Sequence, residues 1–259
     1  MKLVSFRVAG GDAQAGEVRG DAVVAFDDGS TVLDRLASGG RTPAAGAEHA
    51  LAGVELLVPH VPRAIFGIGL NYRDHAAETG KEPPPAPIVF MKLPTSAAAP
   101  GADVRVPAVI RRLDYEAELA VVLGPDATVA GYATANDLSA RDLQGREPQW
   151  TRAKGFDGSC PFGPWVTTAD EVPDPGALRV RSWVNGEPRQ DGSTADLIFA
   201  IDELVAFIAE TITLAPGDLI LTGTPAGVGM AMDPPQFLAS GDVVRLEVES
   251  LGAIEHRIA

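Results

Sequence analysis

The stretch 114–122 constrains the fold of this chain more than any other segment. It places Glu116 and Glu118 two residues apart and then continues into an apolar run. In a β-strand, side chains two residues apart point to the same face, so the two carboxylates share one face while Ala117 and Leu119 occupy the other. Two carboxylates beside an apolar run cost free energy unless a cation neutralises them. The pattern alone favours a strand edge with two solvated glutamates, and the alternative is a metal-binding strand.

A second predicted strand, 129–135, shifts the balance toward the metal. It follows 114–122 closely enough to form a hairpin, and it leads directly to a third acid, Asp137. Three converging carboxylates offer the oxygen ligands that Mg²⁺, Mn²⁺ or Ca²⁺ prefer over zinc. We therefore predict that Glu116, Glu118 and Asp137 bind a divalent metal. The alternative is that Asp137 caps a turn.

A histidine and a glutamate form a second candidate group. His75 and Glu78 are three residues apart in a short predicted helix that Asn71 or Asp74 would cap and that would extend to Gly80. Side chains at this spacing are neighbours on a helix, and a carboxylate beside an imidazole fixes its tautomer and raises its basicity. Taken alone, the spacing is more typical of an ordinary surface pair than of a catalytic dyad.

Several cationic and loop residues are candidates for binding an anion. Lys92 and Lys154 lie in apolar surroundings, where a lysine meets a carboxylate or enolate, or simply extends its head group to solvent. The glycine loop 223–229 follows a predicted strand and can present backbone N–H groups and Thr224 to an anion. Arg141 is followed by Asp142, and the plain alternative for it is a surface ion pair between these two residues.

The organisation of the chain indicates a mainly β protein. The 259 residues include 28 glycines and 21 prolines, which favour many turns and short strands. Residues 1–58 form a predicted small N-terminal β-rich domain, and 59–259 form the main domain. Apolar positions three and four residues apart predict one amphipathic helix, at 195–212.

Charge and hydropathy disfavour some classes of partner. The formal net charge of −14 makes nucleic acid an unfavourable partner, and we find no basic amphipathic segment for a membrane surface. No apolar run approaches the ~20 residues of a membrane span. The N-terminal segment lacks the apolar core of a signal peptide, and the single cysteine, Cys160, is compatible with a reducing compartment, so we expect a cytoplasmic protein.

Taken together, the motifs resemble the fumarylacetoacetate hydrolase family, in its bacterial branch of acylpyruvases and 2-hydroxyhepta-2,4-diene-1,7-dioate isomerases. The resemblance covers roughly residues 60–250, and six motifs occur in the family's order. The matching segments are 69–75, 114–119, 131–144, 154–157, 160–165 and 222–229.

The resemblance implies a fold and a set of roles. The fold is a catalytic β-sandwich roll with a smaller N-terminal domain, usually in a homodimer. The metal, Mg²⁺ or else Mn²⁺ or Ca²⁺, is bound by the three acids. The dyad of His75 and Glu78 lies on a short lid helix that substrate orders. The resemblance also implies that Lys154 lies near the enolate of the reacting substrate. It places Arg141, Gln144 and Thr224 near the substrate carboxylate.

The family's chemistry is mixed, so the resemblance leaves the reaction open. Our leading hypothesis is a metal-dependent hydrolase that cleaves a C–C bond in a small anionic 2-oxo acid of the acylpyruvate or fumarylpyruvate type. The second is an isomerase or decarboxylase of 2-oxo or 2-hydroxydienoate acids, as in aromatic-acid catabolism or oxaloacetate decarboxylation. The third is a non-catalytic protein that keeps the metal pocket.

Overall fold

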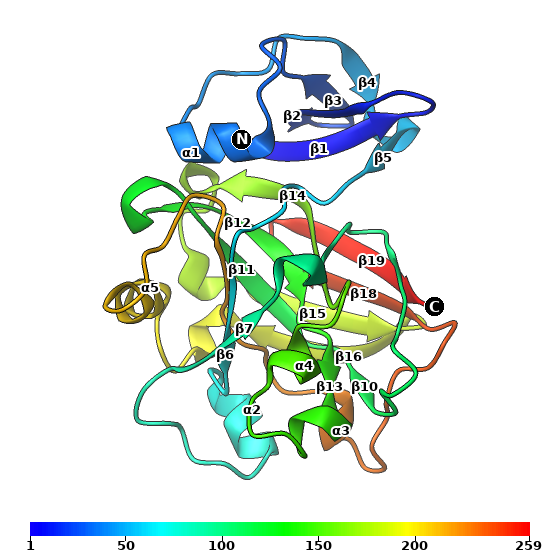
Figure 1. Ribbon diagram of the computed structural model, residues 1–259, viewed down its shortest axis with the longest axis vertical. Helices are drawn as coiled ribbons and strands as arrows, with labels where there is room; N and C mark the ends of the chain where they lie inside the picture. Colours follow the sequence, from blue (N-terminus) through cyan, green and yellow to red (C-terminus); the bar gives the residue numbers. More distant parts are fainter.

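The computed structural model describes residues 1–259 and is built around one large mixed sheet (Figure 1). In spatial order its main path runs β4 (Glu48–Ala50), β3 (Ala22–Ala25), β2 (Ala13–Arg19), β1 (Lys2–Val8), β14 (Cys160–Thr168), β12 (Val129–Asn136), β11 (Ala117–Leu123), β17 (Leu219–Leu221), β6 (Ile65–Gly69) and β7 (Ile88–Lys92). Two short strands join this path at its side, β5 (Val54–Leu56) on β1 and β8 (Ala97–Ala98) on β14.

A second sheet covers one face of the first. It contains β16 (Glu187–Ser193), β15 (Arg179–Val184), β18 (Val243–Val248), β19 (Gly252–Ile258) and β9 (Asp103–Val104), while β10 (Leu113–Asp114) and β13 (Ser139–Ala140) form a separate pair. The helices are short: α1 (Val32–Ser38), α2 (Arg73–Glu78), α3 (Arg141–Gln144), α4 (Thr151–Lys154) and α5 (Ile201–Ala209). The predicted mainly β fold class is confirmed.

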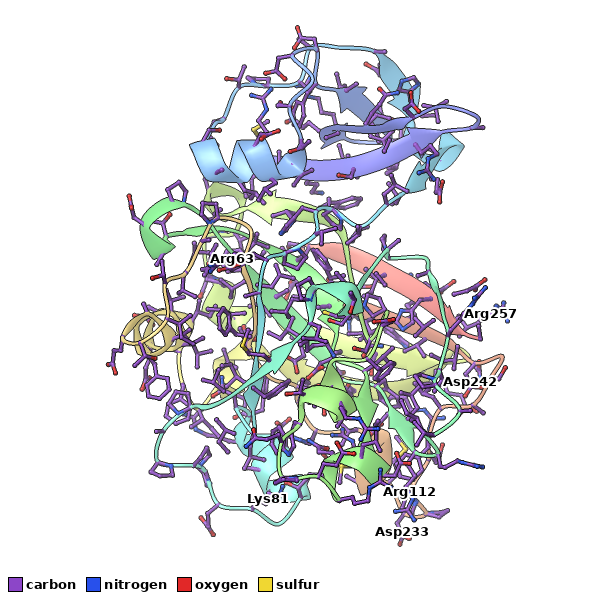
Figure 2. All side chains as sticks on the ribbon, in the orientation of Figure 1. Arg63, Lys81, Arg112, Asp233, Asp242 and Arg257 are labelled. Atoms are coloured by element: carbon purple, nitrogen blue, oxygen red, sulfur yellow. The ribbon has the colours of Figure 1, made fainter.

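Strand β11 lies at the centre of the core and is buried along its whole length. Leu119 and Val121 belong to the largest apolar cluster, together with residues of the second sheet such as Leu246. Ala120 and Val122 point the other way, into a cluster that reaches helix α1. A strand that is covered on both faces reads as a continuous apolar run, and side chains fill the space between the layers (Figure 2).

The N-terminal unit, comprising β1 to β5 and α1, lies at one end of the molecule (Figure 1). It has a small apolar cluster of its own around Val4 and Phe6. Its strands nevertheless extend the large sheet, because β1 pairs antiparallel with β14 at Lys2↔Thr167 and Leu3↔Val166. The division into two domains at residue 58 therefore stays a prediction. The large sheet itself runs without a break from the strands of residues 1–58 into those of the rest of the chain.

The predicted helix at 195–212 is wrong in its extent, because α5 covers only Ile201–Ala209. Before α5, Thr194–Asp196 form a single 3-10 turn. Asn71 then binds the next residues: its backbone carbonyl accepts from the N–H of Ile198 and its side-chain oxygen accepts from the N–H of Phe199 at 2.8 Å. Apolar side chains of this irregular segment pack against the core, and their spacing in the sequence resembles that of a helix. No helix of the structure combines the length and apolar character needed to span a membrane.

Candidate active site and metal centre

Three acids converge where β11 begins and β12 ends. The two strands pair antiparallel with Ala117 opposite Asn136, so Glu116, just before β11, lies across from Asp137, just after β12. The N–H of Asp137 donates to the carbonyl of Glu116 at 3.0 Å. Carboxylate oxygens of Glu116, Glu118 and Asp137 all lie within 4.8 Å of one another, and all three residues are buried. The hairpin thus brings the three predicted ligands together.

Two of the three acids are neutralised by neighbouring cations. The Nζ of Lys154 lies 2.7 Å from Oε2 of Glu116 and 2.6 Å from Oδ2 of Asp137. On the far side, Nζ of Lys92 lies 2.7 Å from Oδ1 of Asp137. Burial by itself raises the pKa of Glu116, but Lys154 and Arg141 outweigh burial and bring that pKa below its ordinary value. Lys92 is committed to this ion pair with Asp137, and it does not line the cavity beside the acids that the following paragraphs describe.

Glu118 is the exception, since it forms no ion pair with any residue of the chain. Its only hydrogen-bond donor is the N–H of Gly223, at 2.7 Å from Oε2. Burial, followed by the charges of Asp137 and Glu116, raises the pKa of Glu118 well above its ordinary value. A buried carboxylate between two other carboxylates, with no cation of its own, fits the ligand set of a hard divalent metal.

The surface pairing of Arg141 with Asp142 is wrong. The side chain of Arg141 is only 7% exposed; its Nε donates to Oδ2 of Asp114 at 2.9 Å and its Nη2 lies 2.6 Å from Oε1 of Glu116. Its Nη1 donates to the amide oxygen of Gln144 at 3.0 Å. Sequence reasoning missed Asp114, although it stands two residues before Glu116 and so continues the same alternation of acids.

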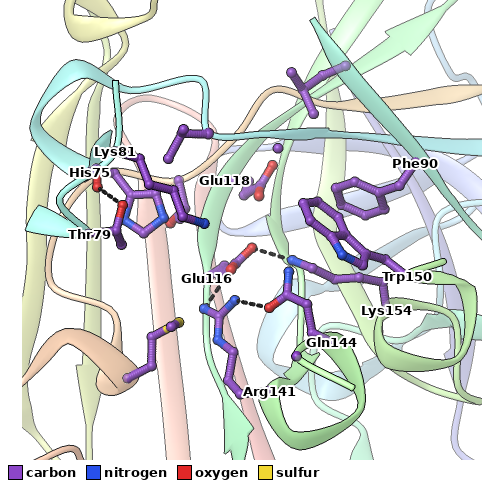
Figure 3. Close-up of a pocket in the computed structure, with 16 residues that line it drawn as sticks. His75, Thr79, Lys81, Phe90, Glu116, Glu118, Arg141, Gln144, Trp150 and Lys154 are labelled. Carbon is purple, nitrogen blue, oxygen red and sulfur yellow. Dashed lines mark hydrogen bonds and ion pairs between the residues drawn. The ribbon is translucent and has the colours of Figure 1, made fainter. Parts of the chain in front are cut away.

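The acids and cations form one side of a cavity of about 250 Å³ (Figure 3). Seven of the nine predicted site residues line it: His75, Glu116, Glu118, Arg141, Gln144, Lys154 and Thr224. The other two, Asp137 and Glu78, lie behind lining residues and bond to them. The cavity opens between α2, α3 and α4, at the end of the molecule remote from the N-terminal unit (Figure 1).

The pair formed by His75 and Glu78 lies on α2 as the spacing predicts. Nδ1 of His75 is 3.0 Å from Oε2 of Glu78. A carboxylate at this position favours the imidazole tautomer that carries its proton on Nδ1, and in that tautomer Nε2 keeps its lone pair. The expected cap at Asn71 or Asp74 is wrong, because Tyr72 precedes the helix and Asp74 lies within it. The Asn71 amide is instead bonded to Phe199 and to Thr222.

The glycine loop 223–229 binds carboxylates of the protein itself. The N–H of Gly223 donates to Glu118, that of Gly227 donates to Oε1 of Glu78 at 2.7 Å, and that of Gly229 donates to Oδ1 of Asp114 at 2.8 Å. The hydroxyl of Thr224 donates to the carbonyl of Ala117 at 2.9 Å. These N–H groups are thereby occupied, and the loop joins three parts of the site instead of offering them to a ligand.

An aromatic wall, formed by Phe90 and Trp150, borders the same cavity and was not predicted. The two rings meet edge to face with centroids 5.5 Å apart. Two glycines of β6 make room for them: a Cβ on Gly67 would overlap the Phe90 ring, and one on Gly69 would lie 2.9 Å from Trp150. The signal in the sequence is a glycine at alternate positions of a buried strand, which marks a close approach on one face.

Comparison with known proteins gives one consistent family. The family model described as fumarylacetoacetate (FAA) hydrolase C-terminal matches residues 64–259. A mitochondrial oxaloacetate tautomerase of Xenopus laevis is 41% identical over 220 residues, covering 80% of this chain and 69% of that protein.

Solved structures agree in fold over the whole chain. The fumarylacetoacetate hydrolase of Exiguobacterium antarcticum superimposes with a TM-score of 0.89 at 33% identity, covering 100% of this chain and 99% of that one. A maleylpyruvate hydrolase from a Sphingobium species, in complex with manganese(II) and pyruvate, gives a TM-score of 0.79 at 28% identity, with coverage of 100% and 99%. On its fold, its motifs and this agreement, the chain belongs to the fumarylacetoacetate hydrolase family.

Proposed function

We propose that this protein is a divalent-metal-dependent hydrolase that cleaves a C–C bond in a small 2-oxo acid of the acylpyruvate or fumarylpyruvate type. One observation carries the proposal: a histidine whose Nε2 is left free by a carboxylate partner lines the same cavity as Glu116 and Glu118, two of the three converging acids. The first group suits proton transfer and the second suits a metal that binds a 2-oxo carboxylate.

Glu116, Glu118 and Asp137 are the residues that would hold the metal. Their oxygen donors favour Mg²⁺ or Mn²⁺, with Ca²⁺ as the third ion of the same ligand preference. Glu118, which forms no ion pair within the chain and accepts only from the N–H of Gly223, supports this assignment. The bound ion would supply a Lewis acid that polarises the 2-oxo group of the substrate.

The residues of the chain then have separate tasks. His75, held by Glu78 through Nδ1, accepts a proton from water at Nε2, and the water oxygen attacks the distal carbonyl carbon. The C–C bond next to that carbon breaks, and its electron pair leaves as the enolate of pyruvate beside the Lys154 ammonium. Protonated His75 returns its proton to the enolate carbon, so water is consumed and two acids are released.

Recognition of the substrate carboxylate is assigned to Arg141, Gln144 and Thr224. Gln144 accepts from Arg141 through its oxygen, which leaves its amide N–H groups to face the cavity. Arg141 is shared between Asp114 and Glu116, so in our proposal it acts as a fixed positive wall. Thr224 contributes van der Waals contact alone, because its hydroxyl donates to the carbonyl of Ala117 and accepts from the amide of Gln190.

Turnover of three 2-oxo acids tests the proposal. Acetylpyruvate, fumarylpyruvate and oxaloacetate are supplied side by side to protein loaded with Mg²⁺ or Mn²⁺ and to protein treated with a chelator. We expect metal-dependent release of pyruvate together with acetate or fumarate. Loss of oxaloacetate with release of carbon dioxide, and no cleavage of the other two acids, would show that the protein is a decarboxylase and not a hydrolase.

A tautomerase or isomerase is the second candidate. The 41% identity to a protein named oxaloacetate tautomerase favours it. The same pair, His75 and Glu78, can carry a proton between carbon 3 and the 2-oxo oxygen without involving water as a nucleophile. Decay of the enol absorbance, with deuterium exchanged into carbon 3 and no pyruvate released, would identify this reaction.

A further inference from the structure

One cation at the cavity differs from all the others. Lys81 follows helix α2 in a Schellman motif: Gly80 has φ +64°, its N–H donates to Ala77, and the N–H of Lys81 donates to Ala76 at 2.9 Å. The position that Lys81 occupies in this motif commonly holds an apolar residue that packs back on the helix. Lys81 stands there instead, exposed to solvent and in a backbone conformation that the motif fixes.

The side chain of Lys81 lines the cavity and has no partner. Figure 3 shows it beside His75, extending toward the acids. The other basic side chains of the centre are paired: Lys154 with Glu116 and Asp137, Arg141 with Glu116 and Asp114. The neighbouring acid Glu78 has given its two oxygens to His75 and Gly227. Lys81 is therefore the one lysine or arginine of the cavity whose charge is not balanced by the chain.

We propose that Lys81 selects substrates that carry a second carboxylate at the end remote from the 2-oxo acid group. This inference rests on the proposed function, which places the 2-oxo acid group on the three buried acids. The remote end of a bound substrate then points away from these acids and toward the solvent-exposed lining residue Lys81, which lies at the lower edge of the molecule (Figure 2). The opposite side, formed by Phe90 and Trp150, offers no charge to an anion.

If α2 acts as a lid, the proposed contact of Lys81 with a remote carboxylate has a second consequence. A remote carboxylate bound by Lys81 connects the C-terminal end of α2 to a ligand that is fixed at the acids. A substrate with two carboxylates therefore holds the lid helix, and with it His75, over the reacting carbons. A substrate with an apolar end provides no such link.

A binding experiment with two stable ligands tests the proposal without relying on turnover. The ligands are 2-oxoadipate and 2-oxohexanoate, which have the same six-carbon chain and differ only in a terminal carboxylate or methyl group. Calorimetry on Mn²⁺-loaded protein gives the ratio of their dissociation constants in wild type, Lys81→Met, Lys81→Arg and Lys2→Met. Lys2 provides the control, since it lies in the N-terminal strand β1 and its replacement changes the net charge equally.

We expect 2-oxoadipate to bind the wild type about tenfold more tightly, and Lys81→Met to remove that preference without weakening 2-oxohexanoate. Lys81→Arg and Lys2→Met should retain it. Equal binding of both ligands to the wild type, or an equal loss for both in Lys81→Met, overturns the selection by Lys81 while leaving the metal-bound 2-oxo acid intact. Failure of both ligands to bind overturns the proposed function, and this inference with it.

Discussion

Glu116 and Glu118 are two residues apart on the same strand face and yet have opposite electrostatic surroundings. Glu116 is paired with Lys154 and Arg141, whereas Glu118 has only the N–H of Gly223. The pKa of Glu116 accordingly falls and that of Glu118 rises. Sequence alternation predicts that the two acids share a face, but it contains no information about which one lacks a cation.

This contrast predicts opposite effects of the same substitution in metal-free protein. Glu118→Gln removes an unbalanced buried charge, so the midpoint of thermal unfolding should hold or rise while metal affinity falls by ~100-fold or more. Glu116→Gln leaves two buried cations short of a partner, which costs roughly 3–5 kcal/mol. Thermal unfolding in chelator and calorimetry with Mn²⁺ measure both quantities. Equal destabilisation by the two variants would show that Glu118 is also neutralised.

The role of His75 predicts a loss confined to chemistry. His75→Ala should lower kcat by roughly 10²–10⁴-fold, the usual contribution of a general base. Metal affinity should stay unchanged, because the histidine bonds to Glu78 and to none of the three acids. Steady-state kinetics at saturating metal give kcat. A variant that retains near wild-type turnover would assign proton transfer to another group.

At the scale of elements, the hairpin that carries the acids was predictable and the long-range connections were not. Alternation predicts both strands of the hairpin, and hairpin geometry then places Asp137 opposite Glu116. The start of α5 was misplaced because Asn71, more than 120 residues earlier in the chain, fixes Phe199 by hydrogen bonds. The ion pair of Arg141 with Asp114 is likewise a tertiary contact, and a local pattern does not encode it.

The lid role implied for α2 predicts a sharp boundary in amide exchange. Asn71 and Tyr72 are fully buried, whereas α2 beyond them has six residues and is tied at its end through Glu78 to Gly227. We expect the amides of 73–82 to exchange much faster than those of β11, and a 2-oxo acid with metal to slow them. Hydrogen exchange followed by mass spectrometry measures this. Protection in α2 equal to that in β11 without ligand would mean that the helix is not a lid.

At the scale of the whole molecule, a buried histidine far along the chain connects stability to pH. Nε2 of His256 accepts from the amide of Asn136 at 3.0 Å, and burial lowers the pKa of His256 to about 4. The unfolded chain protonates this group near its ordinary value of 6.5. Between these values the unfolded state binds more protons, so the free energy of unfolding falls as the pH falls, by at most ~1.4 kcal/mol per pH unit from this group.

Replacing His256 should flatten that dependence. Urea unfolding of chelator-treated protein at pH 7.5 and pH 5.0 gives the loss of stability for wild type and for His256→Gln, which can still accept from Asn136. We expect a smaller loss in the variant. His60, which is also buried with a lowered pKa, stays as a source of the remaining dependence. Identical losses in the two proteins would show that His256 is protonated without cost to the fold.

The glycine loop 223–229 has a consequence for how such an enzyme can change over generations. One loop touches an acid of the proposed metal centre, the glutamate bonded to His75, and the aspartate that holds Arg141. A mutation in this loop disturbs all three contacts together, so most substitutions there should reduce activity. Substitutions that change the preferred substrate are more readily tolerated at Lys81, Trp150 and Met230, which border the cavity from other segments or from the residue just after the loop. A laboratory lineage selected for a new 2-oxo acid should accumulate its substitutions there first.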